Sequence, residues 1–183
     1  MNTLELERRA AQILRICATA TVLWCGAINQ VEALWALTNI AAGAAEHTHV
    51  LIKHGAVPTL VSLLSSSNEE VLEQAMWVLG NLAGEGSTAR DIVLGSNALR
   101  PVVLCLQRAG CGLSMLRIGS WTLSNMCEGQ ARPVVDLHLV LSVLSRLLRS
   151  GSFMSLHPFQ SSRVQLFICP ARPFATLLAP LCT

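Results

Sequence analysis

The chain has 183 residues, which is long enough for one domain with a sizeable buried core. Hydrophobic residues make up 52% of it and charged residues only 13%, about half the usual charged fraction. The formal net charge of +2 excludes a general electrostatic attraction to nucleic acid or to a membrane surface.

Cysteine and histidine spacing gives no sign of a metal site. The seven cysteines form no Cys-x-x-Cys pair, and no histidine spacing resembles that of a zinc site, so we expect no metal and no cofactor. We expect reduced thiols, and therefore a protein of the cytosol or nucleus. The uncharged stretch 16–31 is interrupted by polar residues and too short for a membrane span, and Glu5 and Glu7 disfavour a signal peptide.

The first 29 residues are predicted to be partly helical. Leu6, Ala10, Ile13 and Leu14 recur at helical spacing and indicate one helix over about residues 4–20. Trp24 lies beyond it, and we interpret it as a packing residue.

From residue 30 the pattern becomes regular. Helices are predicted over residues 31–42, 46–53, 57–64 and 69–83, and again over 88–94, 99–106 and 113–127. Gly43 suits the C-terminal cap of the first of these, and the polar link 65–68 should supply the N-cap of the helix from 69. Gly55 and Asn97, 42 residues apart, are predicted to occupy equivalent turns, because both residue types tolerate a left-handed backbone.

The helix predicted over 69–83 has two different faces. One is apolar and should be buried; it comprises Val71, Ala75, Val78, Leu79 and Leu82. The other carries Gln74, Trp77 and Asn81, again at steps of three and four residues. Burial does not explain this second stripe, because Asn is a poor residue inside a helix, costing up to about 0.7 kcal/mol against Ala.

The Trp-x-x-x-Asn pair occurs three times at a long period. The tryptophans are 42 and 44 residues apart, and the pairs are Trp35 with Asn39, Trp77 with Asn81, and Trp121 with Asn125. A helical repeat of about 40 residues is typical of armadillo and HEAT solenoids, and the order short, medium, long helix favours armadillo. We therefore predict an all-α fold, a right-handed armadillo-repeat superhelix (α-solenoid), truncated, with two complete repeats between partial ones. In a truncated solenoid the terminal repeats expose the apolar surface that a neighbouring repeat would cover. This fits the low content of charged residues, and it predicts that the folded chain is only marginally stable.

Three regions are expected. Residues 1–29 form the N-terminal segment and residues 30–149 the armadillo repeats, the last unit having a helix over 137–148. Residues 150–183 contain four prolines, no acidic residue and no helical period, which predicts an irregular C-terminal tail.

Several strings resemble the importin α family: WALTNIAAG, GAVPTLVSLLSS, EQAMWVLGNLAGE, RDIVLGSNALRP and WTLSNMCEG. The order of variants is similar to the second, third and fourth repeats of that family, which form its major site for nuclear localisation signals. The resemblance implies that Glu85 takes the place of an acidic residue that pairs with the key lysine, that Gly43 and Thr48 lie near that pocket, and that Gln74 lines it. The expected peptide-binding residues are therefore Trp35, Asn39, Gly43, Thr48, Gln74, Trp77, Asn81, Glu85, Trp121 and Asn125.

Three positions depart from the family pattern. Ala42 stands where the family commonly has Ser, and Ile118 where it has Asn; each change removes a polar group beside a pocket. Glu128 stands where a basic residue is common, which should strengthen the attraction for a basic peptide.

A structural role for the Trp and Asn residues is the alternative. Trp at a repeat period is often a core residue, and Asn can bond the backbone of a neighbouring repeat. No Ser or Cys lies beside a credible base, so we expect no enzyme and no catalytic residue.

The functional hypothesis is an adaptor in protein import into the nucleus, which binds extended Lys/Arg-rich nuclear localisation signals and occurs in cytoplasm and nucleus. The alternatives are a general armadillo scaffold for protein–protein interaction, or a fragment that lacks the importin β-binding region and is not transport-competent. Importin β is not an expected partner, because residues 1–29 contain as bases only Arg8, Arg9 and Arg15. Nucleic acid and membrane are not expected partners either.

Overall fold

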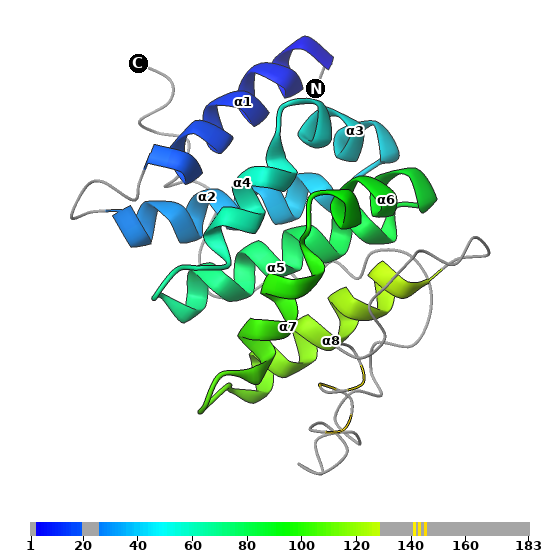
Figure 1. The fold of residues 1–183 in the computed structure, drawn as a ribbon. Helices are drawn as coiled ribbons and strands as arrows, with labels where there is room; N and C mark the ends of the chain where they lie inside the picture. The colour runs from blue at the N-terminus through cyan, green and yellow to red at the C-terminus, as the bar shows by residue number, and fades with distance from the viewer. Residues whose placement is uncertain (1–2, 20–25, 129–140, 142, 144, 146–183) are drawn as a thin grey trace.

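The computed structural model describes residues 3–19, 26–128, 141, 143 and 145 (Figure 1). Within these residues all regular structure is helical, and no helix is both long and apolar enough to span a bilayer. The helices are α1 (Thr3–Thr19), α2 (Gly26–Ala41), α3 (Ala45–Lys53), α4 (Ala56–Leu63), α5 (Glu69–Gly84), α6 (Ser87–Gly95), α7 (Leu99–Gln107) and α8 (Leu113–Cys127).

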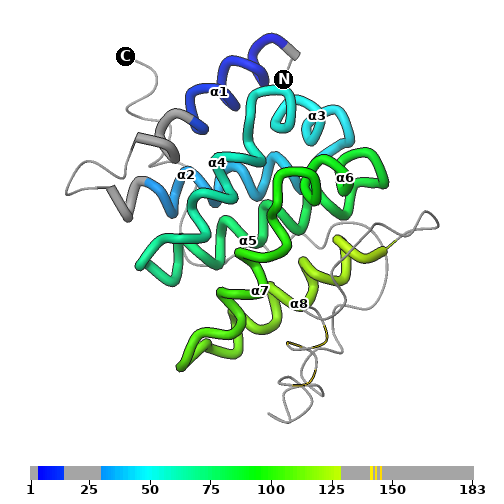
Figure 2. The backbone as a smooth tube through the Cα atoms, in the orientation of Figure 1, coloured from blue at the N-terminus to red at the C-terminus, as the bar shows by residue number. Residues whose placement is uncertain are grey.

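The helices after α2 form two successive three-helix units, α3–α5 and α6–α8. In each unit two short helices, of 9 and 8 residues in the first and of 9 and 9 in the second, precede a long helix of 16 or 15 residues. The long third helices are as predicted, whereas the predicted difference between a short and a medium helix is absent from these two units. The long helix α5 packs against α2 on one side and α8 on the other, so the third helices form a continuous row (Figure 1). Helix α1 lies at the start of the stack against α2, α3 and α4 (Figure 2).

The core follows the apolar stripe predicted on α5. All five stripe residues are fully buried, and Leu72 and Met76 are buried as well. The wider burial arises because α5 is covered by helices on two sides, so only a narrow strip of its surface is left to solvent. That strip contains Trp77.

Local sequence signals set the helix ends. Asn68 is the N-cap of α5, and its side-chain oxygen accepts hydrogen bonds from the backbone N–H groups of Glu70 (2.9 Å) and Val71 (3.2 Å). Gly55 and Asn97 both adopt the left-handed backbone, with φ of 79° and 57°, so the predicted equivalence of these turns is confirmed.

One prediction about α2 was wrong. The helix begins at Gly26 rather than near residue 31, because nothing in 26–30 stops a helix and Gln30 is buried. Gly43 follows the end of α2 as predicted and its N–H donates to the carbonyl oxygen of Ile40 at 3.0 Å, although its backbone is not left-handed. Its lack of a side chain matters for another reason: a Cβ there would lie 2.4 Å from Nδ1 of His47.

Other predictions fall mostly or wholly outside the described residues. These are Trp24, most of the helix over 137–148, and the tail over 150–183. Within 137–148, residues 141, 143 and 145 are described and helical, and Val143 is buried.

The cap of α5 gives a first test. Replacing Asn68 by Ala leaves two amide groups of the first turn without their acceptor and should lower the free energy of unfolding by about 1 kcal/mol. Thermal unfolding followed by circular dichroism measures this. Ser67→Ala changes the neighbouring exposed residue and should have almost no effect; an equal loss in both variants would contradict the assigned cap.

Candidate peptide-binding face

The three Trp-x-x-x-Asn pairs lie on the row of third helices. Trp35 is on α2, Trp77 on α5 and Trp121 on α8, and each indole is half-buried. Each Asn follows one helical turn later, because residues four apart share a helix face. The row therefore brings together residues that are more than 40 positions apart in the sequence.

Asparagine side chains connect the third helices to each other. The amide nitrogen of Asn81 donates to the carbonyl oxygen of Thr38 on α2, at 3.3 Å. The amide nitrogen of Asn125 donates in the same way to the carbonyl oxygen of Gly80 on α5, at 2.9 Å. Thr38 and Gly80 each immediately precede the Asn of their own repeat, so the contact recurs in register.

Asn39 behaves differently. Its amide nitrogen donates to the carbonyl oxygen of Trp35 in its own helix, at 2.9 Å. Among the described residues no third helix precedes α2, so the side chain turns back to the nearest carbonyl of its own helix, as Asn commonly does.

The inter-helix bonds use only part of each amide. A carboxamide has two N–H donors and an acceptor oxygen, and the bond to the preceding helix takes one donor. No buried side-chain nitrogen or oxygen in the described part of the chain lacks a partner. The oxygen of Asn81 accepts no hydrogen bond there, so it must keep contact with solvent even though the residue is only 8% exposed. Each of these Asn residues thus has polar atoms available to a ligand while it holds the repeats together.

The parallel helices α5 and α8 keep a constant side-chain register. Three contacts each join residues 41 positions apart: the Ser114 hydroxyl with the Glu73 carboxylate, the Trp121 ring with Gly80, and the Asn125 amide with Gly84. The same register places Ile118 beside Trp77. Because the Asn81 and Asn125 contacts are equivalent, Gln74 takes the corresponding place beside Trp35 on α2.

Two neighbouring ring sites follow from this register. The first site comprises Trp35, Thr38, Gln74 and Trp77. Its two non-aromatic side chains are polar: the Thr38 hydroxyl donates to the Leu34 carbonyl oxygen at 2.9 Å and lies 3.5 Å from the Gln74 side-chain oxygen. The second site comprises Trp77, Gly80, Ile118 and Trp121, and no polar side chain of this set lies between its rings.

Trp121 is seated directly on α5. A Cβ added to Gly80 would lie 2.3 Å from the Trp121 ring and 2.7 Å from the Thr122 hydroxyl. That hydroxyl donates to the carbonyl oxygen of Met76 at 3.0 Å. Only glycine allows this close approach, so Gly80 determines how near the Trp121 ring lies to α5.

Acidic residues gather at one end of the row. Glu85 is the C-cap of α5 and Glu128 the C-cap of α8, and no basic residue lies in the last turn of α2, α5 or α8. The C-terminal end of a helix carries partial negative charge, so a carboxylate there is unfavourable for helix stability and adds to a negative potential. The end of α5 therefore favours a cationic ligand, whereas at the end of α8 a guanidinium of the protein, from Arg90, already lies against the backbone of Glu128.

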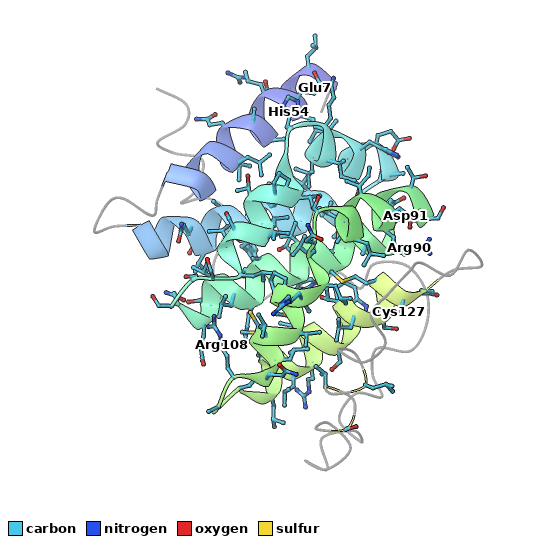
Figure 3. The ribbon with its side chains drawn as sticks, in the orientation of Figure 1. Glu7, His54, Arg90, Asp91, Arg108 and Cys127 are labelled. Carbon is cyan, nitrogen blue, oxygen red and sulfur yellow. The ribbon has the colours of Figure 1, made fainter. Side chains whose placement is uncertain are left out.

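The end of α8 is fastened by Arg90 on α6. Arg90 is only 2% exposed, donates through Nη1 to the carbonyl oxygen of Glu128, and forms an ion pair with Asp91 at 2.9 Å. Figure 3 shows Arg90 and Asp91 on α6 near Cys127, the last residue of α8. This bond fixes the backbone beside the Glu128 carboxylate.

Glu73 lies at the opposite end of α5 from Glu85. Burial raises the pKa of its carboxyl above the usual value, while the hydrogen bond from Ser114 acts in the opposite direction. Its fixed position beside Ser114 helps to hold α5 and α8 in register.

The remaining predicted residues are placed as follows. Gln74 and Glu85 are half-buried, and Gly43 is exposed in the turn after α2. Thr48 differs from the expectation: it is completely buried, and its hydroxyl donates to the carbonyl oxygen of Ala41 at 3.5 Å. This hydrogen bond therefore joins α3 to the last residue of α2 and stabilises the turn between the two helices.

The sequence-based prediction missed Thr38, Gly80 and Arg90. Thr38 and Gly80 carried a usable signal, because each stands one residue before a repeat Asn. Arg90 carried none, because its partner is a backbone carbonyl 38 positions away.

This geometry defines a class: the chain is an armadillo-repeat solenoid. The family model for the Armadillo/beta-catenin-like repeat matches residues 45–84. Solved structures similar in fold include a designed armadillo repeat protein in complex with the peptide (KR)4 (TM-score 0.58, 24% identity, covering 87% of this chain and 68% of that one). Another is an engineered protein (TM-score 0.63, 21% identity, covering 85% and 76%).

Within that class, sequence relatives support a partial importin α armadillo protein. It is 51% identical over 122 residues to importin subunit alpha-2 of Arabidopsis thaliana, and 49% identical over 122 residues to importin subunit alpha-1b of Oryza sativa subsp. japonica. Each match covers 66% of this chain but only 23% of the relative. The chain thus spans about a quarter of the length of these relatives. This class consists of adaptors and scaffolds without enzymatic activity.

The close contact between the Trp121 ring and Gly80 gives the second test. Gly80→Ala should force the indole away from α5 and lower the free energy of unfolding by about 1–3 kcal/mol, because overpacking outweighs the better helix propensity of Ala. The tryptophan emission spectrum and thermal unfolding report the two effects. Gly95→Ala is the matched control, because a Cβ there meets nothing within 4 Å. Unchanged stability and emission in Gly80→Ala would show that the contact is not tight in solution.

Proposed function

We propose that this chain binds extended Lys/Arg-rich peptides of the nuclear localisation signal type along the row α2, α5, α8. It would act as an adaptor in nuclear import, in the cytoplasm and nucleus. One observation carries the proposal: Trp-x-x-x-Asn pairs stand in register on consecutive third helices, with their Asn amides only partly used.

The spacing of the row suits an extended backbone. Packed helices lie about 8–10 Å apart, and an extended peptide advances about 3.3 Å per residue, so one repeat corresponds to two or three peptide residues. An Asn side chain can donate to a peptide carbonyl and accept from a peptide N–H. Because every peptide has these groups, the Asn residues would read the backbone and leave selection of side chains to other groups.

Side-chain selection would come from the rings and the carboxylates. Indole faces attract the ammonium or guanidinium group by about 0.5–2 kcal/mol and pack against the aliphatic stem. Glu85 and Glu128 add the negative potential at the helix ends. Glu85, with Gly43 in the adjacent turn, would pair with the key lysine.

Proteins of similar sequence and fold also support the binding of basic peptides. Those of about 50% identity are named importin α subunits, and a designed solenoid of the same fold was solved with a peptide of alternating Lys and Arg. The second candidate is a general armadillo scaffold that binds a folded or acidic partner, and it rests on the fold alone.

Peptide titration tests the proposal. A labelled Lys-Lys-Lys-Arg-Lys-type peptide should bind, and an acidic peptide of equal length should not, as measured by fluorescence anisotropy. Glu85→Lys should weaken the basic peptide about tenfold at low salt through charge reversal, and less at high salt, because the pair is partly exposed to solvent.

Glu69→Lys is the matched control for that charge reversal. Glu69 is exposed in the first turn of the same helix, far from Glu85, so its reversal should change the affinity little. Equal affinity for the basic and acidic peptides would rule out the proposed function and favour the scaffold.

The shared position of Trp77 gives a further test. Trp77 belongs to both ring sites and Trp121 to one, so Trp77→Ala should lose more binding free energy than Trp121→Ala. Anisotropy measures the affinities, and circular dichroism checks that both variants are folded. A larger loss in Trp121→Ala would contradict the arrangement of the sites.

A further inference from the structure

The residue three positions before each repeat Trp changes character along the row. It is Glu32 on α2, Gln74 on α5 and Ile118 on α8, and all three are half-buried. The series therefore runs from acidic through polar to apolar. Since these positions are equivalent in the repeat, they should contact equivalent parts of a bound peptide.

The two ring sites differ in chemistry for this reason. The first site includes a hydroxyl and a carboxamide, from Thr38 and Gln74. The second site includes Gly80, which has no side chain, and Ile118, which packs against the hydrophobic core. A polar head group placed at the second site would find no side-chain partner in this set.

The nearby charges do not reverse that difference. Glu85 is eight residues beyond Trp77 and Glu128 seven beyond Trp121, or about 10–12 Å along the helix axis. Glu73 is closer, but its carboxylate already accepts a hydrogen bond from Ser114 at 3.0 Å. Within the four residues of the second site, the side chains are therefore two indoles and an isoleucine, and the amides of Asn81 and Asn125 follow one helical turn beyond the rings.

We infer that the second site selects an apolar aliphatic side chain, such as Leu, rather than a basic one. Side chains on one face of an extended peptide recur every two residues, about 6.6 Å apart. The preferred ligand is therefore a basic peptide with an aliphatic residue two positions from the lysine held at the first site. This inference rests on the proposed function and specifies its ligand.

The experiment compares peptides of equal charge. The host is a labelled oligolysine heptapeptide with one position replaced by Leu or by Gln, scanned along the sequence. At one position the Leu peptide should bind about fivefold more tightly than the Gln peptide, because a Leu side chain gains from burial between rings. At all other positions the two peptides should bind equally.

Variants at position 118 assign the preference. Ile118→Asn should abolish or reverse the Leu-to-Gln ratio at the selected position, where both peptides are compared on the same variant so that any general change in affinity cancels. If Ile118→Asn does not fold, Ile118→Val and Ile118→Thr replace it, because the Val and Thr side chains have the same shape but differ in polarity. The Val variant should keep the Leu-to-Gln ratio, and the Thr variant should lower it.

The outcomes separate the two proposals. Binding of basic peptides without any Leu preference, or with a preference that Ile118→Asn and Ile118→Thr leave unchanged, would overturn this inference and leave the proposed function standing. Failure of every basic peptide to bind would overturn both.

Discussion

The bond from an Asn amide to a backbone carbonyl of the preceding third helix sets the geometry of the whole row. Asn81 and Asn125 make it at equivalent places, so α2, α5 and α8 stand in one register. Each Trp lies one helical turn before the Asn on the same helix, so the three tryptophans stand in the same register. The ring sites are thus built before a ligand arrives, and binding would not have to order them.

In this solenoid the residues proposed for peptide binding lie on the same helix that forms the centre of the core. Helix α5 is buried from two sides, and its one open strip carries Trp77 and the accessible part of Asn81. Gly80, between them in sequence, supplies both the carbonyl for Asn125 and the space for Trp121. A change on this strip therefore affects stability and ligand contacts together, and control variants are needed to separate them.

Much of the fold could be predicted from the sequence. The spacing of three Trp-x-x-x-Asn pairs was enough for the repeat, and Asn68, Gly55 and Asn97 act as their residue types suggest. These features are local, or repeat at a fixed period.

The choice of side-chain partners could not be predicted in the same way. An Asn on a third helix can donate to the carbonyl oxygen four residues earlier in its own helix or to a carbonyl oxygen of the preceding third helix. Only the packing decides between these two acceptors. Asn39 and Asn81 resolve that choice differently. The family resemblance implies that Thr48 lies near the pocket, but it could not show that the side chain is completely buried and donates to the carbonyl oxygen of Ala41.

Thr48 and Arg90 occupy equivalent positions in their repeats, yet they bond in opposite directions along the chain. The short Thr48 hydroxyl reaches back to Ala41 on the preceding third helix, whereas the long Arg90 side chain reaches forward to Glu128 at the end of its own repeat. The Thr48 hydrogen bond thus joins α3 to the repeat before it, whereas the Arg90 hydrogen bond joins α6 to the end of its own repeat. The boundary between cooperative units therefore need not coincide with the boundary between sequence repeats.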